Sequence, residues 1–171
     1  MKEDIYILAI ETSCDDTSVA VLKNKKVLSN IVSSQKIHEI FGGVVPEIAS
    51  REHDKLIVPV FRKAIKESKI ELNDFDAIAY TRGPGLLGSL LVGTSFAKSL
   101  AFSLNIPLLE INHMQAHILL IYIDDNPEKP KFPFIALTVS GGHTQLVIDN
   151  SPLDFTEIGT TLDDAAGEAF D

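Results

Sequence analysis

Three short apolar segments open the chain one after another, and the hydrophobic spacing then changes from strand to helix. Residues 5–10 form a continuous apolar run, and residues 17–22 and 27–33 follow as further strand-like segments separated by polar turns. From residue 45 to residue 68, apolar side chains recur at helical spacing. Three successive strands followed by a long helix predict an antiparallel meander that continues into an α/β fold.

Strands and helices then alternate. We predict strands at residues 75–80 and 106–111, a helix at residues 86–104, and a second helix that starts at His113 after Asn112 as its N-cap. The predicted order is therefore β-β-β-α-β-α-β-α.

A segment rich in proline and charge, residues 124–133, interrupts this pattern and is typical of a linker. After it, strands at residues 134–139 and 144–149 flank Gly141-Gly142, and a third strand is expected at 155–158. The strand–turn–strand opening thus occurs twice, which indicates an internal repeat. The predicted organisation is a first domain at residues 1–123, a linker at 124–133 and a truncated start of a second domain at 134–171, where a new helix begins at 162–170.

The composition limits the environment and the partners. The formal net charge is −9, so the chain should not bind a phosphate backbone tightly by itself. Cys14 is the only cysteine, the N-terminus does not resemble a signal peptide, and apolar runs of membrane-spanning length contain or adjoin glycine, proline or charge. These features predict a cytoplasmic protein without a membrane partner.

Two histidines, His113 and His117, stand four residues apart on a predicted helix. This spacing places both imidazoles on one face, where a single zinc, iron, copper or nickel ion can bind them. Two partly buried structural histidines are the alternative. Zinc peptidases carry a glutamate right after the first or right before the second histidine, but Met114 and Ala116 occupy those positions, which argues against such a peptidase.

Two polar loops are candidates for contacts to phosphate. Residues 11–17 supply hydroxyl and carboxylate groups between two strands, and residues 140–144 combine two glycines with flanking hydroxyls. Ordinary polar hairpin turns would explain either loop alone. A pair of such loops, one in each repeat, suggests a nucleotide held between related domains.

Six segments in the same order resemble the bacterial tRNA N6-adenosine threonylcarbamoyltransferase family, once described as O-sialoglycoprotein endopeptidases. The resemblance covers the whole chain but only about the N-terminal half of the usual family length. The segments are Glu11-Thr12-Ser13-Cys14-Asp15, residues 42–53, Arg82-Gly83-Pro84-Gly85, His113-Met114-Gln115-Ala116-His117, Ser140-Gly141-Gly142-His143-Thr144 and residues 160–171.

The resemblance implies the actin/Hsp70/sugar-kinase fold, built from two RNase H-like domains. It also implies transfer of threonylcarbamoyl from threonylcarbamoyl-adenylate to N6 of adenosine 37 in tRNAs that read ANN codons. The implied partners are tRNA, a smaller paralogue and an ATPase. The implied site residues are His113 and His117 as ligands of one divalent iron or zinc ion, Thr138, Val139, Ser140, Gly141, Gly142 and Asp171 as contacts to the adenylate, and Asp15 near the reaction centre.

The family's third metal ligand is an aspartate in the C-terminal half, which this chain lacks. We therefore expect weak metal binding and no transferase activity from these 171 residues alone. The competing hypotheses are a metallopeptidase of the glycoprotease type, a non-catalytic scaffold paralogue, and a small-molecule kinase of the same fold. The histidine pair argues against the scaffold, and Mg²⁺ in a kinase would need oxygen ligands.

Overall fold

A computed structural model describes residues 4–123, 129–167 and 169. The chain divides into two compact units, Met1–His113 and Met114–Asp171, each described by itself below. This division lies at the start of the helix that carries the histidine pair, whereas the sequence places a domain boundary after residue 123. The assignment of residues 124–133 as a linker remains a prediction, and residues 124–128 lie outside the described residues.

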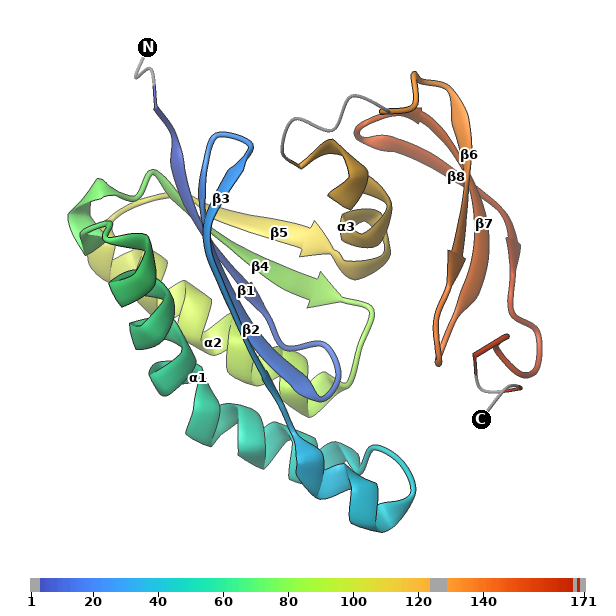
Figure 1. Ribbon diagram of the computed structural model, residues 1–171, viewed down its shortest axis with the longest axis horizontal. Helices are drawn as coiled ribbons and strands as arrows, with labels where there is room; N and C mark the ends of the chain where they lie inside the picture. Colours follow the sequence, from blue (N-terminus) through green and yellow to red (C-terminus); the bar gives the residue numbers. More distant parts are fainter. Residues whose placement is uncertain (1–3, 124–128, 168, 170–171) are drawn as a thin grey trace. The chain divides into compact units, whose positions relative to one another are not determined.

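The first unit is built on a five-stranded sheet of order β3-β2-β1-β4-β5 (Figure 1). Strands β1, β2 and β3 form the predicted antiparallel meander, while β4 and β5 run parallel to β1. The α/β class and the predicted element order are confirmed. The strands are β1 (Tyr6–Glu11), β2 (Asp16–Lys23), β3 (Lys26–Ser34), β4 (Ala77–Gly83) and β5 (Leu108–Asn112).

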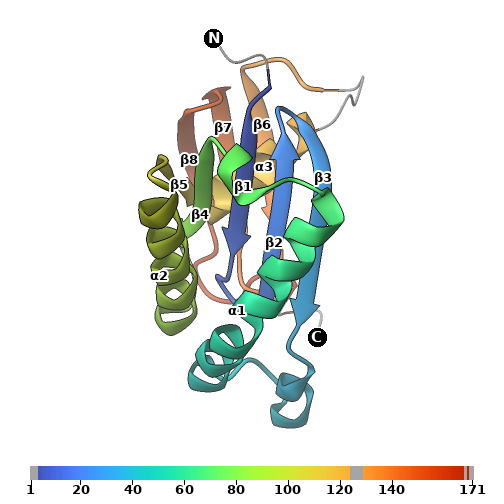
Figure 2. The same cartoon turned by 90° about the vertical axis from the view of Figure 1, so that its left-hand side faces the viewer.

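Two long helices, α1 (Pro46–Ser68) and α2 (Leu87–Leu104), cover one face of this sheet (Figure 2). α1 packs on β2 and β3, α2 packs on β4, and the two helices pack on each other. Leu8 and Val19 of the sheet are fully buried and belong to the same hydrophobic core cluster as Ile57 of α1. This burial is the main stabilising term, because removing apolar surface from water contributes about 25 cal/mol per Å².

α2 is the one helix among the described residues that is long and apolar enough to cross a membrane. A core helix of a globular protein passes the same test of length and composition. Here Ala97 and Ala101 of α2 are buried in the core of the first unit, whereas Leu87, Leu91 and Phe102 are exposed.

Two short 3₁₀ helices are absent from the sequence prediction: η1 (Lys36–Phe41) and η2 (Leu72–Asp74). Each is too short to show a helical repeat of apolar residues. η1 ends at Gly42, which adopts a left-handed backbone conformation. η1 precedes α1. Its buried His38 accepts the backbone N–H of Val45, the N-cap of α1, through Nδ1 at 3.3 Å.

The second unit contains most of α3 (His113–Leu119), the short helix η3 (Leu120–Tyr122) and a three-stranded antiparallel sheet of order β6-β7-β8. Its strands are β6 (Phe134–Val139), β7 (Thr144–Ser151) and β8 (Asp154–Thr160), so a second meander does follow residue 133. The predicted helix at residues 162–170 is not formed in its described part, which consists of bends and turns with one bond from Ala169 N to Ala165 O at 3.0 Å.

Candidate functional site

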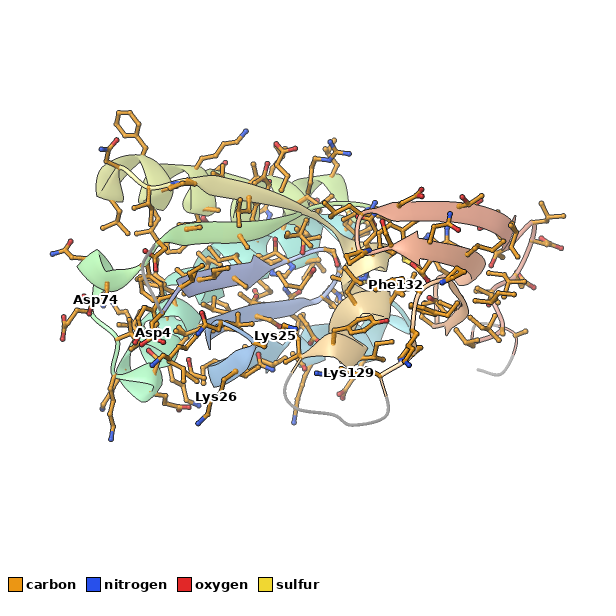
Figure 3. The ribbon with its side chains drawn as sticks, turned by 90° about the horizontal axis from the view of Figure 1, so that it is seen from above. Asp4, Lys25, Lys26, Asp74, Lys129 and Phe132 are labelled. Carbon is orange, nitrogen blue, oxygen red and sulfur yellow. The ribbon has the colours of Figure 1, made fainter. Side chains whose placement is uncertain are left out.

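The carboxyl ends of three parallel strands meet at one edge of the first unit's sheet. β1 ends at Glu11, β4 carries Thr81 near its end, and β5 leads directly into His113. In open α/β sheets, ligands bind at this edge. Asp4 and Asp74, labelled in Figure 3, lie at the other end, where β1 and β4 begin.

Glu11 is the centre of a polar cluster at this edge. Its Oε1 accepts the backbone N–H of Ser13, and its Oε2 accepts the hydroxyl of Thr81. Nδ1 of His113 lies 3.2 Å from Oε2. Burial by itself would raise the pKa of Glu11, but the hydrogen bonds from His113, Ser13 and Thr81 lower this pKa to about 2. The carboxylate is therefore ionised at neutral pH.

α2 and the segment before it form hydrogen bonds to the loop between β1 and β2. Thr12 Oγ1 donates to the carbonyl of Ser89 at 2.9 Å, and the Leu86 N–H donates to the carbonyl of Ser13 at 2.7 Å. A Cβ at Gly85 would lie 2.5 Å from that Ser13 oxygen, so only glycine permits this approach. The Arg82-Gly83-Pro84-Gly85 segment thus supports the loop through close backbone packing.

His53 of α1 also contacts this loop. It is fully buried, and its Nε2 lies 2.9 Å from the carbonyl of Cys14. Because a carbonyl only accepts, Nε2 carries a proton and donates it to Cys14, while Nδ1 lies 2.7 Å from the Thr17 hydroxyl. The imidazole therefore bridges α1 and the loop.

Asp15, the predicted catalytic residue, is half-buried on this loop beside Cys14. Local desolvation and the neighbouring Asp15 carboxylate raise the pKa of the Cys14 thiol to about 11. Cys14 is therefore a neutral thiol at physiological pH and is poorly suited to act as a nucleophile.

His113 and His117 both lie on α3, one helical turn apart, as the sequence predicts. Nδ1 of His113 is engaged by Glu11 and by Ser13 Oγ, each at 3.2 Å, so a metal would have to bind this imidazole through Nε2. Two imidazoles suit zinc or iron chemically. Within the described ranges, however, no group of three histidine, cysteine or acidic side chains is arranged to hold a metal ion. The described donor set thus fits part of a metal site.

The predicted adenylate contacts Thr138, Val139, Ser140, Gly141 and Gly142 form the end of β6 and the turn that follows it. The turn is closed by Ser140: its N–H donates to the carbonyl of His143 at 2.9 Å, and its Oγ accepts the His143 N–H at 3.1 Å.

Gly141 and Gly142 have open space around the position of a Cβ, and neither has a positive φ. The absence of side chains at these two positions leaves the backbone amides of the turn accessible. Asp171, the remaining predicted contact, lies outside the described residues.

Two residues to which the sequence analysis gave no individual role are central to the geometry: Glu11, at the start of the loop at residues 11–17, and His53, at the end of the segment at residues 42–53. Glu11 directly follows an apolar strand, where an acidic residue is common. His53 lies between charged residues on a predicted helix, so its burial is not evident from its neighbours in the sequence. A polar residue at a position of the core-facing helical repeat was the available signal for His53, because buried polar groups are almost always paired. The role of Glu11 becomes visible only once the parallel register of β1, β4 and β5 is known, because this register brings its partners together.

The chain is similar to a family of known proteins. Residues 26–171 match the family described as TsaD, tRNA N6-adenosine threonylcarbamoyltransferase. The protein of that name from Christiangramia forsetii is 63% identical over 170 residues, covering 99% of this chain and 50% of the relative. The one from Riemerella anatipestifer is 60% identical over 172 residues, covering 100% of this chain and 50% of the relative. The chain thus spans about half the length of these curated relatives.

The solved structure of YeaZ from Pseudomonas aeruginosa has a similar fold. It superposes with a TM-score of 0.59 at 21% sequence identity, covering 92% of this chain and 66% of that one. At this identity, the likeness concerns the fold alone, and it agrees with the predicted actin/Hsp70/sugar-kinase-like class.

Proposed function

The chain belongs to the tRNA N6-adenosine threonylcarbamoyltransferase family, and from this premise we propose that it is part of the acyltransferase that modifies adenosine 37 of tRNAs reading ANN codons. The donor is threonylcarbamoyl-adenylate, and the acceptor is N6 of the adenine. The observation that carries the proposal is the 63% identity to a relative of that name over 99% of the chain.

The reaction requires one bond to form and one to break. N6 attacks the carbamoyl carbon, the bond from that carbon to the phosphate oxygen breaks, AMP leaves, and N6 loses a proton. The attacking group is an amine of the substrate, so no protein nucleophile is required. This agrees with the raised pKa of Cys14. We assign Asp15 as the group near the reacting amine that can accept its proton.

We propose His113 and His117 as two ligands of one divalent iron or zinc ion, with the third ligand outside this chain. When bound, such an ion supplies a Lewis acid for the donor's carbonyl or phosphate oxygens. His113 would bind through Nε2, since its Nδ1 faces Glu11 and Ser13. Glutamate is absent at both positions where a zinc peptidase needs it, which argues against a peptidase.

The adenylate is assigned to the turn at residues 138–142 and to Asp171. The Ser140 N–H is already donated to His143, so the backbone amides of Gly141 and Gly142 are the ones that can stabilise negative charge as AMP leaves. Asp171 would accept hydrogen bonds from the ribose hydroxyls.

The partners follow from charge and family. A chain with net charge −9 is a poor ligand for tRNA by itself, so we propose that tRNA is recruited within a complex that includes a smaller paralogue and an ATPase. We place this complex in the cytoplasm.

The test is tRNA modification by the intact protein with its partners, comparing wild type with the double variant His113→Ala/His117→Ala. We expect the variant to lose bound metal and threonylcarbamoyl-adenosine formation together. Leu120→Ala, at an exposed position one turn further along, is the matched control and should retain both. Full modification by the double variant would contradict the metal assignment, and no modification by the wild type with its partners would contradict the proposed function.

A further inference from the structure

The contacts of Glu11 come from three separate elements. Ser13 N–H reaches Oε1 from the β1–β2 loop, the Thr81 hydroxyl reaches Oε2 from β4, and His113 approaches Oε2 from the start of α3. An ionised carboxylate has about four lone-pair sites and can only accept hydrogen bonds. Glu11 therefore fixes which atoms around it must be donors.

This requirement determines the proton position on His113. Nδ1 lies 3.2 Å from Oε2 of Glu11, and a bare nitrogen lone pair there would face a negative charge. A proton on Nδ1 converts this repulsion into a charge-assisted hydrogen bond. Ser13 Oγ, also 3.2 Å from Nδ1, can accept a share of the same proton.

We propose that Glu11 is a positioning residue that accepts the Nδ1 proton of His113, fixing the ring's orientation and leaving Nε2 as the nitrogen for a metal. The inference rests on the proposed function for its metal, and on the three contacts for its geometry. Carboxylate–histidine–metal arrangements of this kind orient the ligand and raise its basicity, and their loss typically costs 10–100-fold in metal affinity.

A purely structural role for Glu11 makes a different prediction. If the side chain only anchored the loop, Glu11→Gln would be nearly neutral, because the amide oxygen can still accept the Ser13 N–H. The same variant places an NH₂ donor opposite Nδ1. That donor favours the other tautomer of His113, with its proton on Nε2, where a metal would bind.

The experiment reads the His113 tautomer by long-range ¹H–¹⁵N NMR in the intact, metal-free protein at neutral pH, and then titrates in Zn²⁺. We expect Nδ1–H in the wild type, Nε2–H in Glu11→Gln, and a zinc affinity lowered about 10–100-fold in that variant. Ser13→Ala is the matched control, since it removes Oγ beside Nδ1 but keeps the backbone N–H to Glu11. It should retain the Nδ1–H tautomer.

Two outcomes would overturn the inference: a wild-type His113 with its proton on Nε2, or a Glu11→Gln variant with unchanged tautomer and zinc affinity. The first readout needs no variant, so misfolding of Glu11→Gln cannot leave the question open. A wild type that holds the Nδ1–H tautomer but binds no zinc through His113 would refute the proposed metal role and leave the Glu11 contact established.

Discussion

His53 is the residue on which the position of the candidate catalytic loop most depends. Its two ring nitrogens join Thr17 and the Cys14 carbonyl, and both His53 and Thr17 are fully buried. His53→Ala leaves the buried Thr17 hydroxyl without this hydrogen bond and creates a cavity, so we expect a loss of about 2–4 kcal/mol in the free energy of unfolding. Urea denaturation measures this change.

Two further substitutions separate the bridge from general damage to α1. Thr17→Val removes one of the two hydrogen bonds and should cost about 1 kcal/mol. Asp54→Ala changes an exposed neighbour and should leave stability within about 0.5 kcal/mol of wild type. A His53→Ala variant as stable as Asp54→Ala would refute the bridge.

Asp149 of β7 is a buried acid whose pKa shifts in the opposite direction from that of Glu11. It is fully buried, and neither carboxylate oxygen has a hydrogen-bond partner among the described residues. Burial raises the pKa of Asp149 above its ordinary value of 3.8. The folded state therefore binds this proton more tightly than the unfolded state, and the stability linked to Asp149 is lost as pH rises from 3.8 through the raised value.

Asp149→Asn removes this dependence. We expect the variant to be more stable than wild type at neutral pH, with a difference that shrinks as pH falls toward 3.8. Thermal unfolding across a pH series measures it, and Asp154→Asn, at an exposed position of β8, is the control. A pH-independent difference between Asp149→Asn and wild type would show that the pKa of Asp149 is the same in the folded and unfolded states, which would contradict the effect of burial.

At the level of single residues, sequence reasoning found the histidine pair and the loops but missed the contacts around them. His113 and His117 are visible because helical periodicity fixes their spacing without any tertiary information. The Glu11–His113 contact joins residues 102 positions apart and depends on the register of three strands. No local pattern contains that register.

At the level of elements, α1 continues through a proline. Pro59 is exposed within this 23-residue helix, and it has no N–H to donate to the carbonyl of Lys55. The helix persists because Ile57 and Val60 are buried on its other side. Tertiary burial therefore outweighs the local cost here.

Pro59→Ala should restore the missing hydrogen bond and stabilise the chain by about 1–3 kcal/mol, the upper value being the usual cost of an interior proline. The gain is reduced because alanine leaves the unfolded chain more flexible. Val58→Ala, at an exposed neighbouring position, is the comparison. Differential scanning calorimetry should show a higher Tm only for Pro59→Ala, and an unchanged or lower Tm would mean that α1 is adapted to the proline.

β6 was predicted at its observed bounds, and α2 was predicted to within one residue of them. The apolar residues of β6 end at a polar turn, and α2 is a long, mostly apolar segment that follows Gly83-Pro84-Gly85. The helix expected at residues 162–170 was predicted from acidic residues and small side chains alone. Such residues favour a helix start, but they supply no apolar face to pack one.

At the level of the whole molecule, the two meanders differ in how their faces are covered. In the first unit, α1 and α2 bury the apolar face of β1, β2 and β3. In the second unit, alternate side chains of β6 remain open to solvent, with Ile135 and Leu137 each 64% exposed and Val139 55% exposed. Leu146 of β7 lies opposite Leu137 in register and extends this apolar stripe.

An exposed stripe of this kind favours association, because contiguous apolar patches are buried wherever a partner surface is available. We expect the 171-residue chain to self-associate with rising concentration. The double variant Ile135→Thr/Leu137→Thr keeps strand-forming residues while removing apolar surface, so it should remain monomeric. Light scattering coupled to size exclusion measures the mass. Leu153→Thr, at an isolated exposed position in the β7–β8 turn, should associate like wild type, and a wild type that stays monomeric at all concentrations would show that this stripe alone is not enough to hold two copies together.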